Sequence, residues 1–147
     1  MILQARHGLG LVHAASDLRR RTIDLDPELL KSAPEFIRIT VHELFHFVWR
    51  RLDNGTRRGW RALLDQEIAA AVPGELGWSA EWRKVKIVAD GGSAGRWRDY
   101  ACESFCDTAA WYFSPRRRHE EFTLSARARA KRRKWFDRLL DTRQLPL

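Results

Sequence analysis

The chain has 147 residues, of which 44% are hydrophobic and 11% aromatic. This composition excludes an intrinsically disordered chain, and the length suits one hydrophobic core, so we expect a single domain over residues 1–147. The 27 Lys and Arg against 19 Asp and Glu give a net charge of +8. This surplus suits nucleic acid, anionic membranes or acidic proteins, but an arginine-rich surface without such a partner is the simpler interpretation.

The sequence carries no sign of a membrane or export signal. No apolar run approaches the ~20 residues needed to span a bilayer, and residues 1–21 lack the charged start and unbroken apolar centre of a signal peptide. The two cysteines, Cys102 and Cys106, stand four residues apart in a helical pattern, a spacing poorly placed for a disulfide. We therefore expect a cytoplasmic protein with no membrane partner.

Two short stretches near the N-terminus have strand character. They are "GLGLVHAAS", residues 8–16, and "RTIDLD", residues 21–26, and they predict a hairpin or two strands of one small sheet. A helix is expected next, because Ser32 and Glu35 have the spacing of a capping box. It should run through Arg51 and end near Gly55, which can adopt the left-handed conformation that closes a helix.

The rest of the chain reads as helices separated by turn signals. We expect them over residues 57–72, from 79 onward, over 96–113 and after 125, with a flexible loop at 90–95. The predicted fold class is α+β, mainly helical, with a short antiparallel or mixed sheet packed on the helix that follows it.

That helix carries the motif "HELFH", in which His42 and His46 are four residues apart and Glu43 follows the first histidine. Residues i and i+4 share a helix face, so both imidazoles can bind one metal ion, and Glu43 can act as a general base on a water molecule beside it. The alternative is a pair of core or half-exposed histidines bonded to backbone or carboxylates. The surrounding side chains are uncharged, and this favours the metal site because buried polar groups need partners.

A catalytic zinc ion usually has three protein ligands. The segment "DYACESFCDTAAWYF" supplies Glu103, an acid among apolar neighbours, as the predicted third ligand. Asp107 follows one turn later and can accept a hydrogen bond from the nitrogen of a zinc-bound histidine that does not face the metal. His7, His13 and His119 are the alternative ligands.

Hydrolysis also needs a donor for the oxyanion. We expect Tyr100, on the same helix face as Glu103, to be this donor, with His13 as the other candidate. Tyr112, Cys102 and Cys106 are expected to pack in the core, whereas Trp78 and Trp82 could line a cleft.

"TVHELFHF" followed downstream by "ESFCD" resembles the gluzincin metallopeptidases, and the chain is most similar to minimal members of that group. The resemblance implies a zincin-like fold and one zinc ion per chain, bound by His42, His46 and Glu103. It also implies that Glu43 is the general base and that Asp107 supports His42.

The sequence thus predicts zinc-dependent hydrolysis of a peptide or protein substrate. The alternative function is a non-catalytic module stabilised by zinc, which could bind nucleic acid through its basic C-terminal segment, residues 127–134. The intact Glu43 favours the enzyme. The sequence specifies no oligomeric state.

Overall fold

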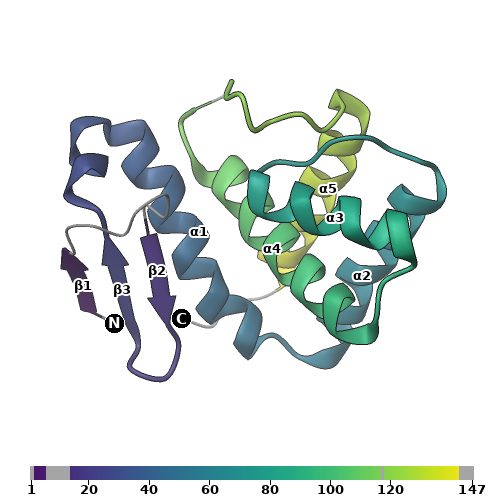
Figure 1. Ribbon diagram of the computed structural model, residues 1–147, viewed down its shortest axis with the longest axis horizontal. Helices are drawn as coiled ribbons and strands as arrows, with labels where there is room; N and C mark the ends of the chain where they lie inside the picture. Colours follow the sequence, from purple (N-terminus) through teal and green to yellow (C-terminus); the bar gives the residue numbers. More distant parts are fainter. Residues whose placement is uncertain (1, 6–13, 117, 143–147) are drawn as a thin grey trace.

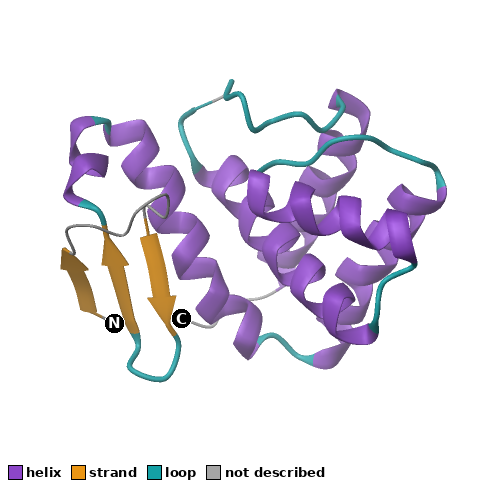
Figure 2. Cartoon of the chain, viewed as in Figure 1, coloured by secondary structure: helices purple, strands orange, loops and turns teal. Residues whose placement is uncertain are grey.

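The computed structural model describes residues 2–5, 14–116 and 118–142. The fold is α+β and mainly helical, as predicted (Figures 1 and 2). Its elements are β1 (Ile2–Ala5), β2 (Ala14–Asp17), β3 (Thr22–Leu25), the 3-10 helix η1 (Pro27–Lys31), α1 (Ala33–Arg51), α2 (Asn54–Ala69), α3 (Trp78–Asp90), α4 (Ala94–Phe113) and α5 (Ala126–Thr142).

The strands form a mixed sheet in the order β1-β3-β2, with β1 parallel and β2 antiparallel to β3. The predicted hairpin is the β2–β3 pair, while residues 8–13 of the predicted first strand lie outside the described residues. The sheet packs on α1 through a small apolar cluster that includes Ile23, Leu25 and Phe47. Figure 1 shows the sheet on one side of α1 and the other four helices on the opposite side. The helix bearing the two histidines is therefore central to the fold.

The main core lies among the α-helices and is rich in aromatic side chains. It is built from residues of every α-helix, among them Phe45, Val48, Trp60, Leu64, Ile87, Phe105, Ala109, Phe136 and Leu139. Phe105 of α4 contacts the rings of Phe45, Trp60 and Phe136. Such ring contacts bury large apolar areas and hold α4 rigidly against its neighbours.

The predicted ends of α1 need correction. Ser32 is the N-cap, but its side chain makes no capping hydrogen bond, and Glu35 instead accepts one from Arg38. The predicted capping box is therefore wrong, because the arginine is the stronger partner for the carboxylate. Gly55 does not end α1 either: it lies in the first turn of α2, and Asp53 caps that helix by accepting a hydrogen bond from the backbone of Thr56.

A buried cation joins α2 and α5 to the segment before α3. Arg132 is fully buried and donates hydrogen bonds to Glu67 and Glu75 at 2.6–3.2 Å. Glu75 also accepts a hydrogen bond from Tyr100 at 2.5 Å. Burial alone would raise the pKa of Glu75, but the charge of Arg132 and its hydrogen bonds, aided by Lys84, lower it. One arginine of the predicted basic segment 127–134 is thus a core residue.

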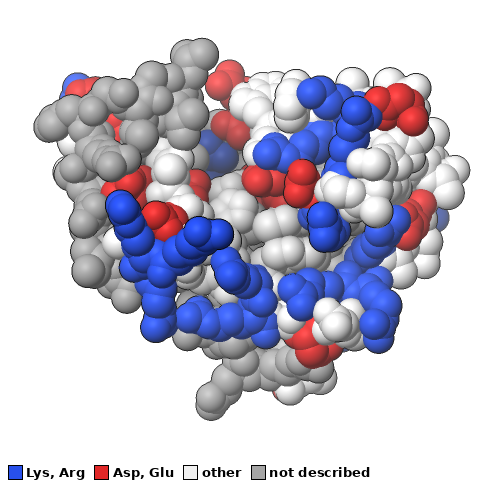
Figure 3. All heavy atoms as spheres, turned by 60° about the horizontal axis from the view of Figure 1, so that its bottom comes forward, with Lys and Arg blue, Asp and Glu red and all other residues white. Residues whose placement is uncertain are grey.

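The surface retains the basic character of the sequence. On the face that Figure 3 turns forward, Lys and Arg predominate over acidic side chains and lie close to one another. Among the described residues, no helix combines the length and apolarity needed to cross a bilayer.

Candidate metal centre

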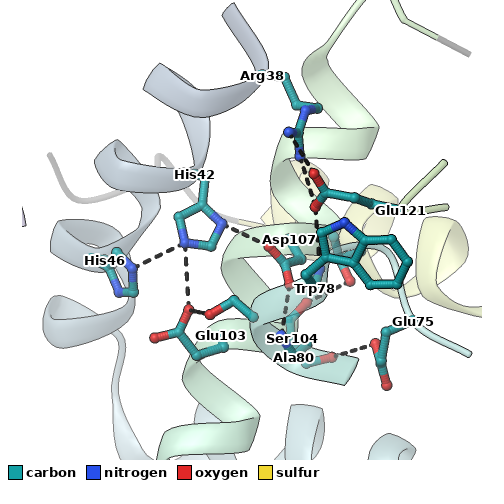
Figure 4. A network of polar contacts seen from close by, with 12 residues as sticks. Arg38, His42, His46, Glu75, Trp78, Ala80, Glu103, Ser104, Asp107 and Glu121 are labelled. Atoms are coloured by element: carbon teal, nitrogen blue, oxygen red, sulfur yellow. Dashed lines mark hydrogen bonds and ion pairs between the residues drawn. The ribbon is translucent and has the colours of Figure 1, made fainter. Parts of the chain in front are cut away.

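The two histidines of α1 direct their Nε2 atoms toward each other. The Nε2 atoms of His42 and His46 are 3.2 Å apart, and the ring planes are inclined by 76°. Glu43 is buried, and one of its carboxylate oxygens lies within 4.8 Å of a ring nitrogen of each histidine. The helical i, i+4 spacing predicted from the sequence therefore brings these three side chains together (Figure 4 shows the two histidines).

Helix α4 supplies the carboxylate of Glu103 to the same place. Its Oε2 lies 3.5 Å from Nε2 of His42 and accepts a 2.6 Å hydrogen bond from the hydroxyl of Ser79. Its Oε1 lies 3.5 Å from the guanidinium of Arg83. Residues from α3 thus orient Glu103 toward His42 (Figure 4).

Asp107 holds the other side of the His42 ring. Its Oδ1 lies 2.8 Å from Nδ1 of His42, and its Oδ2 accepts a 3.1 Å hydrogen bond from the backbone nitrogen of Ala80, in the first turn of α3. A Cβ on Gly77 would overlap this carboxylate. The structure places Asp107 where the sequence predicted, and a proton on Nδ1 leaves Nε2 of His42 free to bind a metal.

The charges of the site favour a protonated imidazole at His42 when no metal replaces the proton. Burial would lower the pKa of His42, but the charge of Asp107 and the hydrogen bonds to Asp107 and Glu103 raise it well above its ordinary value. Burial would likewise raise the pKa of Glu103, but the hydrogen bond from His42, the charges of His46 and His42, and the Ser79 hydroxyl lower it to about 2. Without a metal, the site therefore holds an ionised Glu103 beside a protonated His42, and a metal ion can displace the proton on Nε2 of His42.

The distances from His42 to the other two predicted ligands suit zinc. Bonds of 2.0–2.1 Å in a tetrahedral site place neighbouring ligand atoms about 3.3 Å apart. From Nε2 of His42, the distances are 3.2 Å to Nε2 of His46 and 3.5 Å to Oε2 of Glu103. Two imidazoles and one carboxylate are also a donor set of catalytic zinc sites. The donor types and these two distances from His42 therefore fit the ion.

A second group of possible ligands overlaps the first at His46. Sγ of Cys102 lies 3.4 Å from Nδ1 of His46, and Cys106 is close enough to form a three-residue group with them. The hydrogen bond with Cys106 is the main cause that lowers the pKa of Cys102 to about 6, helped by His46 against the effect of burial. Both cysteines were expected to be core residues. Cys106 is fully buried, whereas Cys102 also contacts a predicted zinc ligand.

Tyr100 does not belong to the site, so its prediction as oxyanion donor is wrong. Its hydroxyl is buried and donates to Glu75 in the Arg132 cluster. The helical turn between Tyr100 and Glu103 rotates the tyrosine toward the core side of α4, where Glu75 is the available acceptor. Tyr112 donates to Asp137 of α5, well along α4 from Glu103.

Of the alternative histidine ligands, His119 is described, and it contacts carboxylates away from the pair on α1. Nε2 of His119 lies 3.5 Å from Glu35, and its Nδ1 lies 3.8 Å from Glu121. His7 and His13 lie outside the described residues. Among the described residues, Glu103 is therefore the predicted third ligand that approaches His42.

Sequence reasoning missed the contribution of α3. Ser79, Arg83, Gly77 and the backbone of Ala80 contact Glu103 or Asp107. No local motif marks these residues, because they act through packing against α4. The one available signal was Gly77, whose lack of a side chain permits the close approach to Asp107.

The start of α3 is held in place from α1. Arg38, one turn before His42, is buried and donates to Glu121 at 3.0 Å, and Glu121 accepts a 3.1 Å hydrogen bond from the backbone of Trp78 (Figure 4). Trp78 and Trp82 are 52% and 57% exposed, so they lie at the surface beside the residues that contact Glu103. Trp82 lines a small pocket with Arg83 and Lys86, whereas the expectation that Trp78 lines a cleft stays a prediction.

The comparisons with known proteins add no family. The chain matches no protein-family model, and no curated protein and no solved structure is detectably similar to it. The function must therefore be argued from the site itself.

Proposed function

We propose that the chain is a zinc-dependent peptidase, a hydrolase with a zincin-like arrangement of a small sheet against the metal-binding helix. The observation that carries this proposal is the position of His42, whose Nε2 lies 3.2 Å from Nε2 of His46 and 3.5 Å from Oε2 of Glu103. Both distances suit neighbouring ligands of one zinc ion. When bound, zinc polarises a carbonyl group and lowers the pKa of a water molecule toward neutrality.

Each of the remaining residues has a defined task in this proposal. Glu43 is the general base: it takes a proton from the attacking water and passes it to the leaving amine. Its burial and its position within 4.8 Å of the ring nitrogens support this role. Asp107 holds the tautomer and orientation of His42, and Ser79 orients Glu103.

The substrate in this proposal is a peptide or protein that lies along α3. Exposed indole rings of Trp78 and Trp82 offer an apolar surface beside the site. Arg83 is a cationic donor near Glu103, and we assign the stabilisation of the oxyanion to it in place of Tyr100. Arg83→Lys, which keeps the charge, should lower kcat more than it raises KM if this assignment holds.

The test combines metal analysis with hydrolysis. Elemental analysis of the purified chain should give about one zinc per chain, and His46→Ala and Glu103→Ala should lose or weaken it. Glu43→Gln should retain the zinc and lower kcat/KM on a peptide library by about 10²–10⁴-fold. The exposed Glu120→Gln is the matched control and should remain active.

The alternative is a zinc-stabilised module that cleaves nothing and binds nucleic acid through its basic C-terminal helix. In that case Glu43→Gln changes neither metal content nor any measured function. The burial of Arg132 removes one cation from the predicted binding segment, and the buried Glu43 would have no task. A chain that contains no zinc after reconstitution would contradict both candidates.

A further inference from the structure

A cavity of about 420 Å³ lies where the end of α1 meets the first turns of α2 and α4. Its wall contains four arginines and two tryptophans: Arg57, Arg58, Arg61, Arg98, Trp49 and Trp97. We call this cavity the arginine pocket. Its volume is within the range of sites that bind small molecules or single units of a polymer.

The positive charge of the arginine pocket is poorly compensated. Arg58 and Arg98 are exposed and make no ion pair with any described residue. Arg57 donates to the neutral amide oxygen of Asn54 at 3.0 Å, and Arg61 lies 3.7 Å from Asp65. Guanidinium groups gathered in one concave site repel one another, so a bound polyanion stabilises the arrangement.

The shape of the cations points to phosphate rather than to an isolated negative charge. Arginine presents a planar fork of donors that binds phosphate oxygens in pairs. Three of the four arginines lie on α2: Arg57 and Arg61 are four residues apart on one face, and Arg58 is next to Arg57. Such a row can contact successive phosphates of a strand.

The arginine pocket also contains flat surfaces on which a base can stack. The guanidinium carbon of Arg61 lies 4.7 Å from the centre of the Trp97 ring, which holds the guanidinium plane in position. Trp49 is half-buried and packs on Phe105, with ring centres 5.1 Å apart. Bases stack on arginine and aromatic planes when they are not already paired in a duplex. An acidic peptide would satisfy the charges but would leave these planes unused.

We propose that the arginine pocket binds single-stranded nucleic acid, with the base of one nucleotide against Arg61 and the phosphates on Arg57, Arg58 and Arg98. This site differs in position from the basic segment 127–134 of α5. It does not depend on the proposed peptidase activity, because it shares no residue with the metal centre. The two properties can therefore be tested and can fail separately.

The test measures binding of a fluorescently labelled 12-nucleotide single strand by anisotropy at several salt concentrations. The pocket variant, Arg58→Ser with Arg98→Ser, removes two cations whose side chains are exposed, so the fold should survive. Two lost phosphate contacts should weaken binding by roughly 25-fold at 0.1 M salt and reduce the salt slope by about 1.4. The matched control, Arg127→Ser with Lys131→Ser, removes the same charge from exposed positions of α5 and should weaken binding by less than about threefold.

The ligand class is tested with the same assay. A strand of equal length without bases should bind the parent at least about fivefold more weakly, because stacking is lost. A nucleoside monophosphate and a polyglutamate peptide of equal charge should compete only weakly. The proposal is overturned if the α5 control loses as much affinity as the pocket variant. It is also overturned if the baseless strand, the mononucleotide or the polyglutamate binds as tightly as the intact strand.

Discussion

Asp107→Asn should weaken zinc binding without removing any proposed ligand. The carboxylate serves two donors at once, Nδ1 of His42 at 2.8 Å and the backbone nitrogen of Ala80 at 3.1 Å. An asparagine side chain has one acceptor oxygen and one amide nitrogen, so it cannot serve both. If its oxygen faces Ala80, its nitrogen donates to Nδ1 of His42, and the proton moves to the nitrogen that should bind zinc. If its oxygen faces His42, the buried Ala80 donor loses its partner.

The expected magnitude follows from these contacts. Loss of a group that orients a histidine ligand lowers metal affinity by about 10–100-fold, which corresponds to about 1.4–2.7 kcal/mol at 25 °C. The zinc-dependent part of the unfolding free energy, at one fixed zinc concentration above the dissociation constant, should fall by the same amount. Competition with a chromogenic chelator at pH 7 measures the first quantity, and urea unfolding with and without zinc measures the second.

The control for this prediction is Asp99→Asn, which removes one exposed carboxylate from the same helix. It should change zinc affinity by less than about twofold, because an exposed charge is screened by solvent. An unchanged zinc affinity in Asp107→Asn, with both variants folded, would refute the reasoning that Asp107 sets the tautomer of His42. Equal losses in the two variants would refute it as well, because the effect would then be one of net charge.

Three more measurements test the structure independently. Arg132→Met should lower the unfolding free energy by about 3–5 kcal/mol in urea, because it leaves two glutamates buried without their cation; a loss under about 1 kcal/mol would contradict the cluster. The pKa of His42 is raised in the folded protein. In EDTA-treated protein, the protonated His42 therefore stabilises the fold fully below its unfolded-state pKa of about 6.5, and this contribution is lost as the pH rises through the folded-state pKa. Urea titrations from pH 6 to 9 should therefore show a decline that His42→Gln lacks. Gly77→Ala should displace Asp107 and weaken zinc binding. Gly95→Ala should bind zinc normally, because its new methyl group would make only ordinary van der Waals contacts.

The local patterns of the chain determined its helices and the central part of the site. Apolar periodicity and turn residues predicted five α-helices, and all five are present with ends shifted by a few residues. The i, i+4 spacing of His42 and His46 is a property of one helix, and so is the shared face of Glu103 and Asp107. These relations need no knowledge of distant contacts.

Tertiary packing decided which helix faces meet. Tyr100 and Glu103 are near neighbours on α4, but the tyrosine donates to Glu75 in the core. Ser79 and Arg83 of α3 contact Glu103 at the site. Apart from Gly77, the sequence around residue 79 contains no sign of that role. The role arises because Gly77 lets α3 approach Asp107 closely.

Tertiary packing also decided which charged side chains are buried and which are open to a ligand. Composition showed a surplus of cations, but it could not distinguish Arg132, which neutralises two buried glutamates, from Arg58 and Arg98, which line an open cavity. Whether a cation binds internal carboxylates or remains available to a ligand depends on which side chains from distant segments reach it and how far water is excluded. Spacing along one helix determines which residues share a face, and packing between helices determines which residues of other segments that face contacts.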